Sequence, residues 1–128
     1  MPMMQFSVAP WRVLSKENAA ICHKMSKLHE EMGEYILDLA KKASKTGEPI
    51  VKPMELAFPG NGYETIKDQF VLGNEIIVAP VTEKGARLRK VVLPKGNWKA
   101  EDGKTYKGGK IAEVSVPLER LPYFRKEN

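Results

Sequence analysis

The sequence is poor in cysteine and has no long apolar run. Its single cysteine, Cys22, excludes an internal disulfide and falls on the apolar side of a predicted helix, where an inert, buried thiol is expected. No apolar stretch approaches the roughly 18–20 residues that cross a bilayer, so no membrane partner is predicted. The amino terminus lacks a basic region followed by an apolar stretch, which predicts a soluble chain without a signal peptide and leaves the compartment open.

Clusters of residues that carry chemistry are also scarce. His23 and His29 stand six positions apart, a spacing that does not place them on one helix face, so no metal site is predicted. No glycine-rich phosphate loop occurs, and no cofactor is predicted. Glu30, Glu31 and Glu34 alternate with lysines on the polar side of the same helix, which favours solvated ion pairs over catalysis.

Neither basic nor acidic residues are concentrated in one part of the sequence. The net charge is +5, from 21 Lys and Arg against 16 Asp and Glu, and the basic residues alternate with acidic ones. The one dense basic stretch, residues 87–90, is typical of the outer face of a strand, so no nucleic-acid partner is predicted. With 42% hydrophobic and 29% charged residues, the chain has the composition of a globular domain.

A long amphipathic helix is the clearest structural feature. Ser15 is a good N-cap, and Gly47 supplies the stop after a lysine-rich last turn. Between them, apolar residues recur at alternating steps of three and four, which predicts one continuous helix of about six turns. These residues are Ile21, Met25, Leu28, Met32, Ile36, Leu39 and Ala43.

Short apolar runs at residues 3–8 and 49–54 flank this helix as predicted strands. A strand, a helix and a second strand form a βαβ unit, which requires a parallel sheet with more strands than these two. The sequence therefore predicts a fragment, with further strands supplied before residue 1.

The second half has the pattern of a small antiparallel sandwich. One or two helical turns are expected at residues 64–70, and strands are expected at 75–80, 87–93 and 110–116. Glycine-containing turns separate these strands at roughly ten-residue spacing, as in β-sandwiches. We place a boundary near residue 70.

Several motifs run through this half. Residues 47–54 read GEPIVKPM, and a Phe-Pro pair follows at 58–59. Residues 68–81 read DQFVLGNEIIVAPV, and residues 90–98 read KVVLPKGNW. In this order and spacing they resemble the carboxy-terminal part of glycoside hydrolase family 31, which includes α-glucosidases and α-xylosidases. The resemblance is specific at residues 68–81 and looser before residue 47.

The resemblance implies an α+β chain: one long helix flanked by two short strands at the end of a (β/α)8 barrel, followed by a small antiparallel β-sandwich. Residues 3–8 would be the seventh barrel strand and residues 49–54 the eighth, with the helix on the outer ring. Residues 1–69 would then be part of the barrel, and residues 70–128 part of the proximal carboxy-terminal β-domain.

The family's retaining mechanism uses two carboxyl groups, and the resemblance places both catalytic aspartates upstream, so none is expected here. Substrate-binding groups come from the carboxy ends of barrel strands, which points to Trp11, Arg12 and Glu55. An indole can stack on a sugar and a guanidinium can donate paired hydrogen bonds; alternatively, Trp11 packs in the rim and Arg12 pairs with an acid. Much of the family has Arg-Asn-His after this proline, and this chain does not, so the sugar preference stays open.

The sequence therefore predicts the carboxy-terminal segment of an enzyme that hydrolyses α-glucosidic or α-xylosidic bonds, with an α-linked oligosaccharide or glycoside as partner. Alone, the chain is expected to be inactive and to self-associate through unpaired barrel strands. The alternative is a free-standing carbohydrate-binding or scaffolding β-module, in which Trp98 and Tyr106 stack on sugar. In the family interpretation these two side chains pack inside the sandwich.

Overall fold

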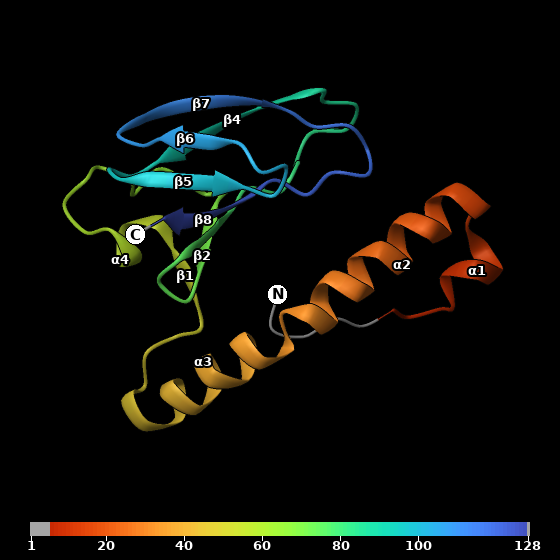
Figure 1. Ribbon diagram of the computed structural model, residues 1–128, viewed down its shortest axis with the longest axis horizontal. Helices are drawn as coiled ribbons and strands as arrows, with labels where there is room; N and C mark the ends of the chain where they lie inside the picture. Colours follow the sequence, from red (N-terminus) through yellow and green to blue (C-terminus); the bar gives the residue numbers. More distant parts are fainter. Residues whose placement is uncertain (1–5, 128) are drawn as a thin grey trace. The chain divides into compact units, whose positions relative to one another are not determined.

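The computed structural model describes residues 6–127, and the chain divides into two compact units, with the boundary in the sequence between Ile50 and Val51 (Figure 1). The first unit is helical and the second is built from β-strands. Within the described residues, no helix combines the length and the apolar composition that crossing a membrane needs.

Three helices make up the first unit: α1 (Pro10–Val13), α2 (Lys16–Glu31) and α3 (Gly33–Thr46). The Oγ of Ser15 accepts a hydrogen bond from the amide of Asn18 at 3.2 Å, so the predicted N-cap is confirmed. Gly47 adopts φ 72°, a left-handed conformation that favours glycine, and ends α3 as predicted.

The single continuous helix predicted between Ser15 and Gly47 is wrong, because the helix is interrupted at Met32. Met32 has φ −82° and ψ −2°, outside the usual helical range, and Gly33 follows it. Glycine is the weakest helix former after proline. The prediction of one helix depended only on the spacing of apolar residues, to which Gly33 does not contribute. The predicted strand at 3–8 is also wrong over residues 6–8, which form no strand; residues 3–5 lie outside the described residues.

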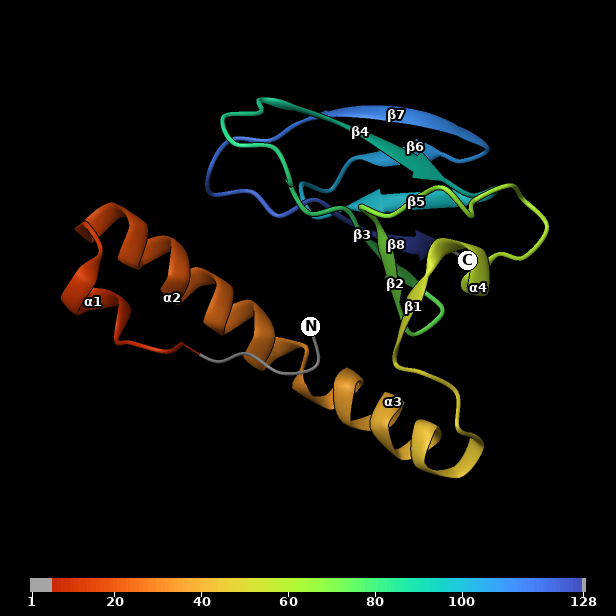
Figure 2. The ribbon, with the colours of Figure 1, turned by 180° about the vertical axis from the view of Figure 1, so that it is seen from behind.

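The second unit contains two antiparallel sheets. The larger has the order β1-β2-β3-β8-β5-β6, and the smaller pairs β4 with β7. Figure 2 shows β3 and β8 from behind, with the short helix α4 (Met54–Ala57) directly after β1. The strands are β1 (Val51–Pro53), β2 (Phe70–Leu72), β3 (Ile76–Val78), β4 (Leu88–Leu93), β5 (Asn97–Ala100), β6 (Thr105–Lys107), β7 (Lys110–Ser115) and β8 (Tyr123–Glu127).

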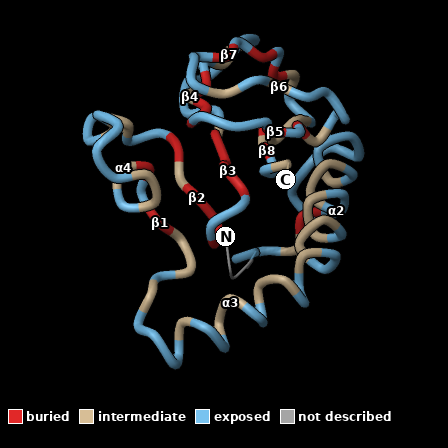
Figure 3. Tube along the Cα trace, turned by 60° about the vertical axis from the view of Figure 1, so that its left-hand side comes forward, coloured by how far each residue is buried: buried red, intermediate tan, exposed pale blue. Residues whose placement is uncertain are grey.

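One apolar core joins the two sheets. It contains Val91 from β4, Trp98 from β5 and Phe124 from β8, each 0% exposed, together with residues of β2, β3, β7 and α4. The buried segments in Figure 3 lie along these strands. Since full burial of a large apolar side chain contributes about 1.5–3 kcal/mol, this core is the main source of stability of the second unit.

The predicted antiparallel sandwich is confirmed in type, and the strands expected at 75–80, 87–93 and 110–116 appear as β3, β4 and β7. The helical turns expected at 64–70 are wrong: residues 64–65 form a turn, and Phe70 begins β2. The parallel sheet is not confirmed either, because β1 pairs antiparallel with β2, with Lys52 opposite Val71. The loop between β1 and β2 reverses the direction of the chain. The pattern within a single strand does not show which strand it pairs with or in which direction. Assignment of residues 1–69 to a barrel stays a prediction.

Candidate functional site

Two of the predicted substrate-binding residues, Trp11 and Arg12, lie side by side on α1. Pro10 opens this helix, and the amide of Arg12 donates to the carbonyl of Ala9 at 3.0 Å, which fixes the short turn. The Trp11 side chain is 77% exposed, so it is accessible to a ligand. Arg12 is also exposed. An exposed indole beside a hydrogen-bond donor is therefore present on this turn, and contact of either with a sugar stays a prediction.

The third predicted residue, Glu55, belongs to α4 in the second unit. Its Oε1 accepts the amide of Gly60 at 3.2 Å, and its Oε2 accepts the amide of Tyr63 at 3.2 Å. Asn61 closes the same loop through hydrogen bonds from its Nδ2 to the carbonyls of Phe58 and Pro59, at 2.9 and 3.1 Å. Glu55 therefore holds the loop of residues 58–63 with both carboxylate oxygens. Direct contact with a sugar stays a prediction for this residue.

A groove of about 510 Å³ opens beside Glu55. Its volume is within the range of small-ligand sites. The groove was not predicted, because it combines β1 and α4 with a segment that begins eight residues after Glu55 at Tyr63. Its lining consists of Val51, Lys52, Pro53, Glu55, Tyr63, Glu64, Ile66, Lys67, Gln69 and Phe70.

Polar contacts fix the segment of residues 68–69, which leads from this groove into β2. Gln69 is 5% exposed, and its side-chain amide pairs with the backbone of Val92 as a strand would: Nε2 donates to the carbonyl at 3.0 Å, and Oε1 accepts the amide at 2.8 Å. The neighbouring Asp68 forms an ion pair with Arg89 at 2.7 Å between Oδ2 and Nη2. Arg89 also donates to the carbonyl of Pro80 at 3.1 Å. The Asp-Gln pair of the sequence motif is thus a structural tie between strands.

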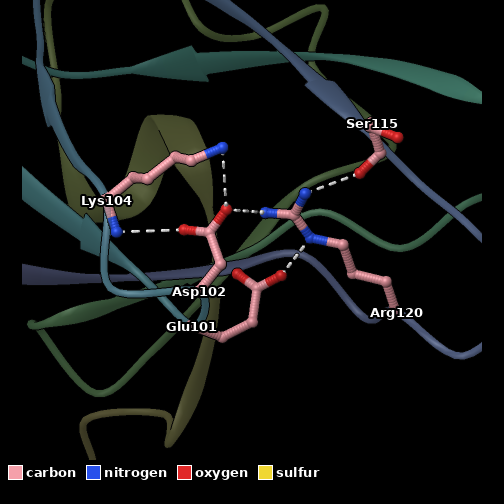
Figure 4. A network of polar contacts seen from close by, with 5 residues as sticks. All are labelled: Glu101, Asp102, Lys104, Ser115 and Arg120. Atoms are coloured by element: carbon pink, nitrogen blue, oxygen red, sulfur yellow. Dashed lines mark hydrogen bonds and ion pairs between the residues drawn. The ribbon is translucent and has the colours of Figure 1, made fainter.

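A second polar cluster centres on Arg120 (Figure 4). Its Nε binds Oε1 of Glu101, its Nη2 lies 3.3 Å from Oδ2 of Asp102, and its Nη1 donates to the carbonyl of Ser115 at 2.7 Å. The hydrogen bond that Arg120 donates to Glu101, together with the negative charges of Glu101 and Asp102, raises the pKa of the Arg120 guanidinium. Asp102 also accepts the amide of Lys104 at 3.0 Å.

These two acids do not have the arrangement of a glycosidase pair. A retaining glycosidase needs one carboxylate as nucleophile and a second group as acid and base, about 5–5.5 Å apart with a sugar between them. Glu101 and Asp102 instead both pair with the guanidinium of Arg120, which offsets part of their negative charge. Among residues 6–127, no group of three or more His, Cys, Asp or Glu is placed to hold a metal ion.

Of the two aromatic residues in the alternative prediction, Trp98 lies in the core and Tyr106 packs against it. Trp98 is 0% exposed, and its Nε1 donates to the carbonyl of Pro94 at 2.8 Å. Its ring meets Phe58 edge to face, with centroids 6.2 Å apart. Tyr106 packs in the same manner on Phe124 at 5.6 Å. Stacking of Trp98 on a sugar is therefore wrong, and its predicted packing role is confirmed.

Residues 47–128 match the C-terminal domain of glycosyl hydrolase family 31. The chain is 37% identical over 130 residues to the myogenesis-regulating glycosidase of Mus musculus, covering 97% of this chain and 18% of that protein. Among solved structures, a family 31 α-xylosidase from a soil metagenome, complexed with xylose, superposes with a TM-score of 0.85 and 36% identity, covering 88% of this chain and 17% of that one. A Flavobacterium johnsoniae family 31 dextranase, complexed with glucose, has a TM-score of 0.88 and 33% identity, covering 94% and 15%. The chain thus spans less than a fifth of each relative's length.

Proposed function

The chain belongs to glycoside hydrolase family 31, and from this premise we propose that it serves as the carboxy-terminal segment of an enzyme that hydrolyses α-glucosidic or α-xylosidic bonds with retention of configuration. The observation that carries the proposal is the match over residues 47–128, which includes the buried tie of Gln69 to Val92. The two superposed relatives, one complexed with xylose and one with glucose, support the choice of sugars.

In this proposal the chain contributes no catalytic carboxylate. Glu101 and Asp102 are occupied by Arg120, and Glu55 is occupied by two backbone amides of its own loop. Hydrolysis then depends on carboxylates supplied from outside these residues. The chain alone is accordingly inactive.

Trp11, Arg12 and Glu55 are proposed to contact the substrate in the assembled enzyme. The exposure of Trp11 and Arg12 on α1 supports this for the helical unit. For Glu55, the place directly after β1, where the strand ends at Pro53, supports it, although the carboxylate already holds the loop of residues 58–63. Trp11 would stack on a pyranose ring, and Arg12 would donate to its hydroxyls.

The first experiment is an immunoblot of the source cells with an antibody against residues 104–111, which are mostly exposed. A band several times larger than 14.4 kDa is expected. The captured protein is then assayed on aryl α-glucoside and aryl α-xyloside, with the first-formed anomer identified by NMR. Release of the α-anomer supports a retaining mechanism.

Two controls complete this test. The 128-residue chain purified alone is assayed under the same conditions, and no hydrolysis is expected. A band only at 14.4 kDa, or a captured protein that cleaves neither substrate, would contradict the proposal. The binding or scaffolding module would then become the better description.

A further inference from the structure

The groove beside Glu55 has an apolar floor whose residues are not part of the core. In β2, Val71 points into the core and is 0% exposed. Because successive side chains of a strand alternate between faces, Phe70 lies on the opposite face. There it stands next to Pro53 of β1, its partner in the antiparallel register, and both line the groove. A half-buried aromatic ring and an exposed proline ring thus form an apolar surface open to a ligand.

The wall of the groove is positioned by Glu55. Its carboxylate binds the amide of Tyr63, and the turn that follows is closed by a hydrogen bond from the amide of Ile66 to the carbonyl of Tyr63 at 3.0 Å. Tyr63 and Ile66 both pack against the core and line the groove. The wall is therefore held in place before any ligand binds, which lowers the entropic cost of binding.

Two oppositely charged side chains stand at the rim. Glu64 and Lys67 are exposed and line the groove. A carboxylate accepts hydrogen bonds and an ammonium group donates them, so the rim offers both functions with no net charge.

From these features we infer that the groove is a non-catalytic binding site for a neutral pyranose sugar. A pyranose has an apolar C–H face, which fits the surface of Phe70 and Pro53, and a ring of hydroxyls, which both donate to Glu64 and accept from Lys67. The balanced charge of the rim favours a neutral polyol over an anion or a cation. The choice of α-glucoside and α-xyloside as ligands rests on the proposed function.

The test is an NMR titration of the full 128-residue chain with methyl α-glucoside and, separately, methyl α-xyloside. Saturable shifts are expected for backbone amides of residues 63–70, with millimolar affinity. Phe70→Ala removes the stacking surface and should weaken binding about tenfold. Absence of saturable shifts, or shifts confined to other residues, would overturn the inference.

Because Phe70 is also a sheet residue, a second variant changes only exposed groups. The double substitution Glu64→Gln with Lys67→Met should weaken binding several-fold while the spectrum of the core residues stays unchanged. The matched control, Glu83→Gln with Lys84→Met, removes the same two charges at exposed positions outside the groove and should leave binding intact. Equal loss in both variants would refute a specific site.

This result is separable from the proposed function. Hydrolysis by the captured enzyme without sugar binding to the chain would refute the groove alone. Sugar binding without hydrolysis would refute the proposed function alone. Concentration-dependent shifts at residues 63–70 without sugar would show that a second copy of the chain occupies the groove, and would also overturn the inference.

Discussion

Gly108 occupies a position in which a side chain has no room. A Cβ built there would lie 1.8 Å from the carbonyl oxygen of Pro94 and 3.0 Å from Nε1 of Trp98, the two atoms whose hydrogen bond fixes the buried indole. The amide of Gly108 is also bound to the carbonyl of Gly96 at 2.7 Å, which prevents the backbone from moving away. The close approach of two chain segments explains the glycine here.

Gly108→Ala should therefore destabilise the chain by about 3 kcal/mol, the upper part of the range for overpacked cores. Urea unfolding followed by circular dichroism measures the effect as a lower midpoint. The matched control is Gly85→Ala, where φ is +80° but nothing lies within 4 Å, so only backbone strain of about 1–2 kcal/mol is expected. An equal loss of unfolding free energy in the two variants would show that the backbone shifts and removes the clash at residue 108.

Arg120 is the second residue on which the sandwich depends. Arg120→Ala leaves Glu101, whose side chain is 17% exposed, without its cation, and should cost about 2–3 kcal/mol. Arg120→Lys should recover only part of this, because an ammonium group cannot reach three partners in one plane. Lys104→Ala is the control: its side chain is 73% exposed and 3.7 Å from Asp102, so its loss should cost less than about 1 kcal/mol. An unchanged free energy of unfolding in Arg120→Ala would contradict the stabilising role assigned to this cluster.

For individual residues, the sequence indicated which ones have a structural or functional role but not which residues they contact. The Asp-Gln pair at 68–69 was recognised as part of a motif, yet Arg89 and Val92 lie 21 and 23 positions away. Glu55 was selected for its place after a strand, and its contacts with Gly60 and Tyr63 depend on a loop conformation that no periodicity encodes. Contacts between residues this far apart in the sequence can be identified only once the fold is known.

Among the elements, the interruption between α2 and α3 is the most open to experiment. Gly33 has nothing within 4 Å of a built Cβ, so alanine fits without steric cost. Gly33→Ala should favour helix by up to about 1 kcal/mol and extend helical hydrogen bonding through Met32. Far-UV circular dichroism should show increased helicity, with Ser44→Ala as a control for a helical substitution away from the interruption. Unchanged helicity would mean that Met32 itself, rather than Gly33, ends α2.

The elements also show why some strands could be predicted and others not. β4 and β7 have six residues each, long enough for an apolar pattern to be visible. β2 and β6 have three residues each and β5 has four, and none of these was predicted. β1 and β3 also have three residues, and each was predicted because it lies within a longer apolar run, at residues 49–54 and 75–80. A strand of three residues carries no period, and its pairing is fixed by neighbours from elsewhere in the chain.

For the whole molecule, association of the purified chain stays a prediction. Neither α2 nor α3 contains a buried residue, although both carry the apolar face that the sequence indicated. Incompletely covered apolar faces associate in water. Light scattering over a concentration series should show a rising mean mass. Ile36→Lys should reduce the association, and Ser44→Lys, which adds the same charge at an exposed position, should not. A constant monomer mass would contradict this expectation.

The two tryptophans of the chain stand in opposite environments, one in each compact unit. Trp11 is 77% exposed in the helical unit, and Trp98 is 0% exposed in the β-unit with its ring nitrogen bound. Their fluorescence is therefore spectrally distinct, with red-shifted emission from Trp11 and blue-shifted emission from Trp98. A single unlabelled sample can report on both units at once, so that melting of the β-unit is read as a red shift of one component while the other stays constant.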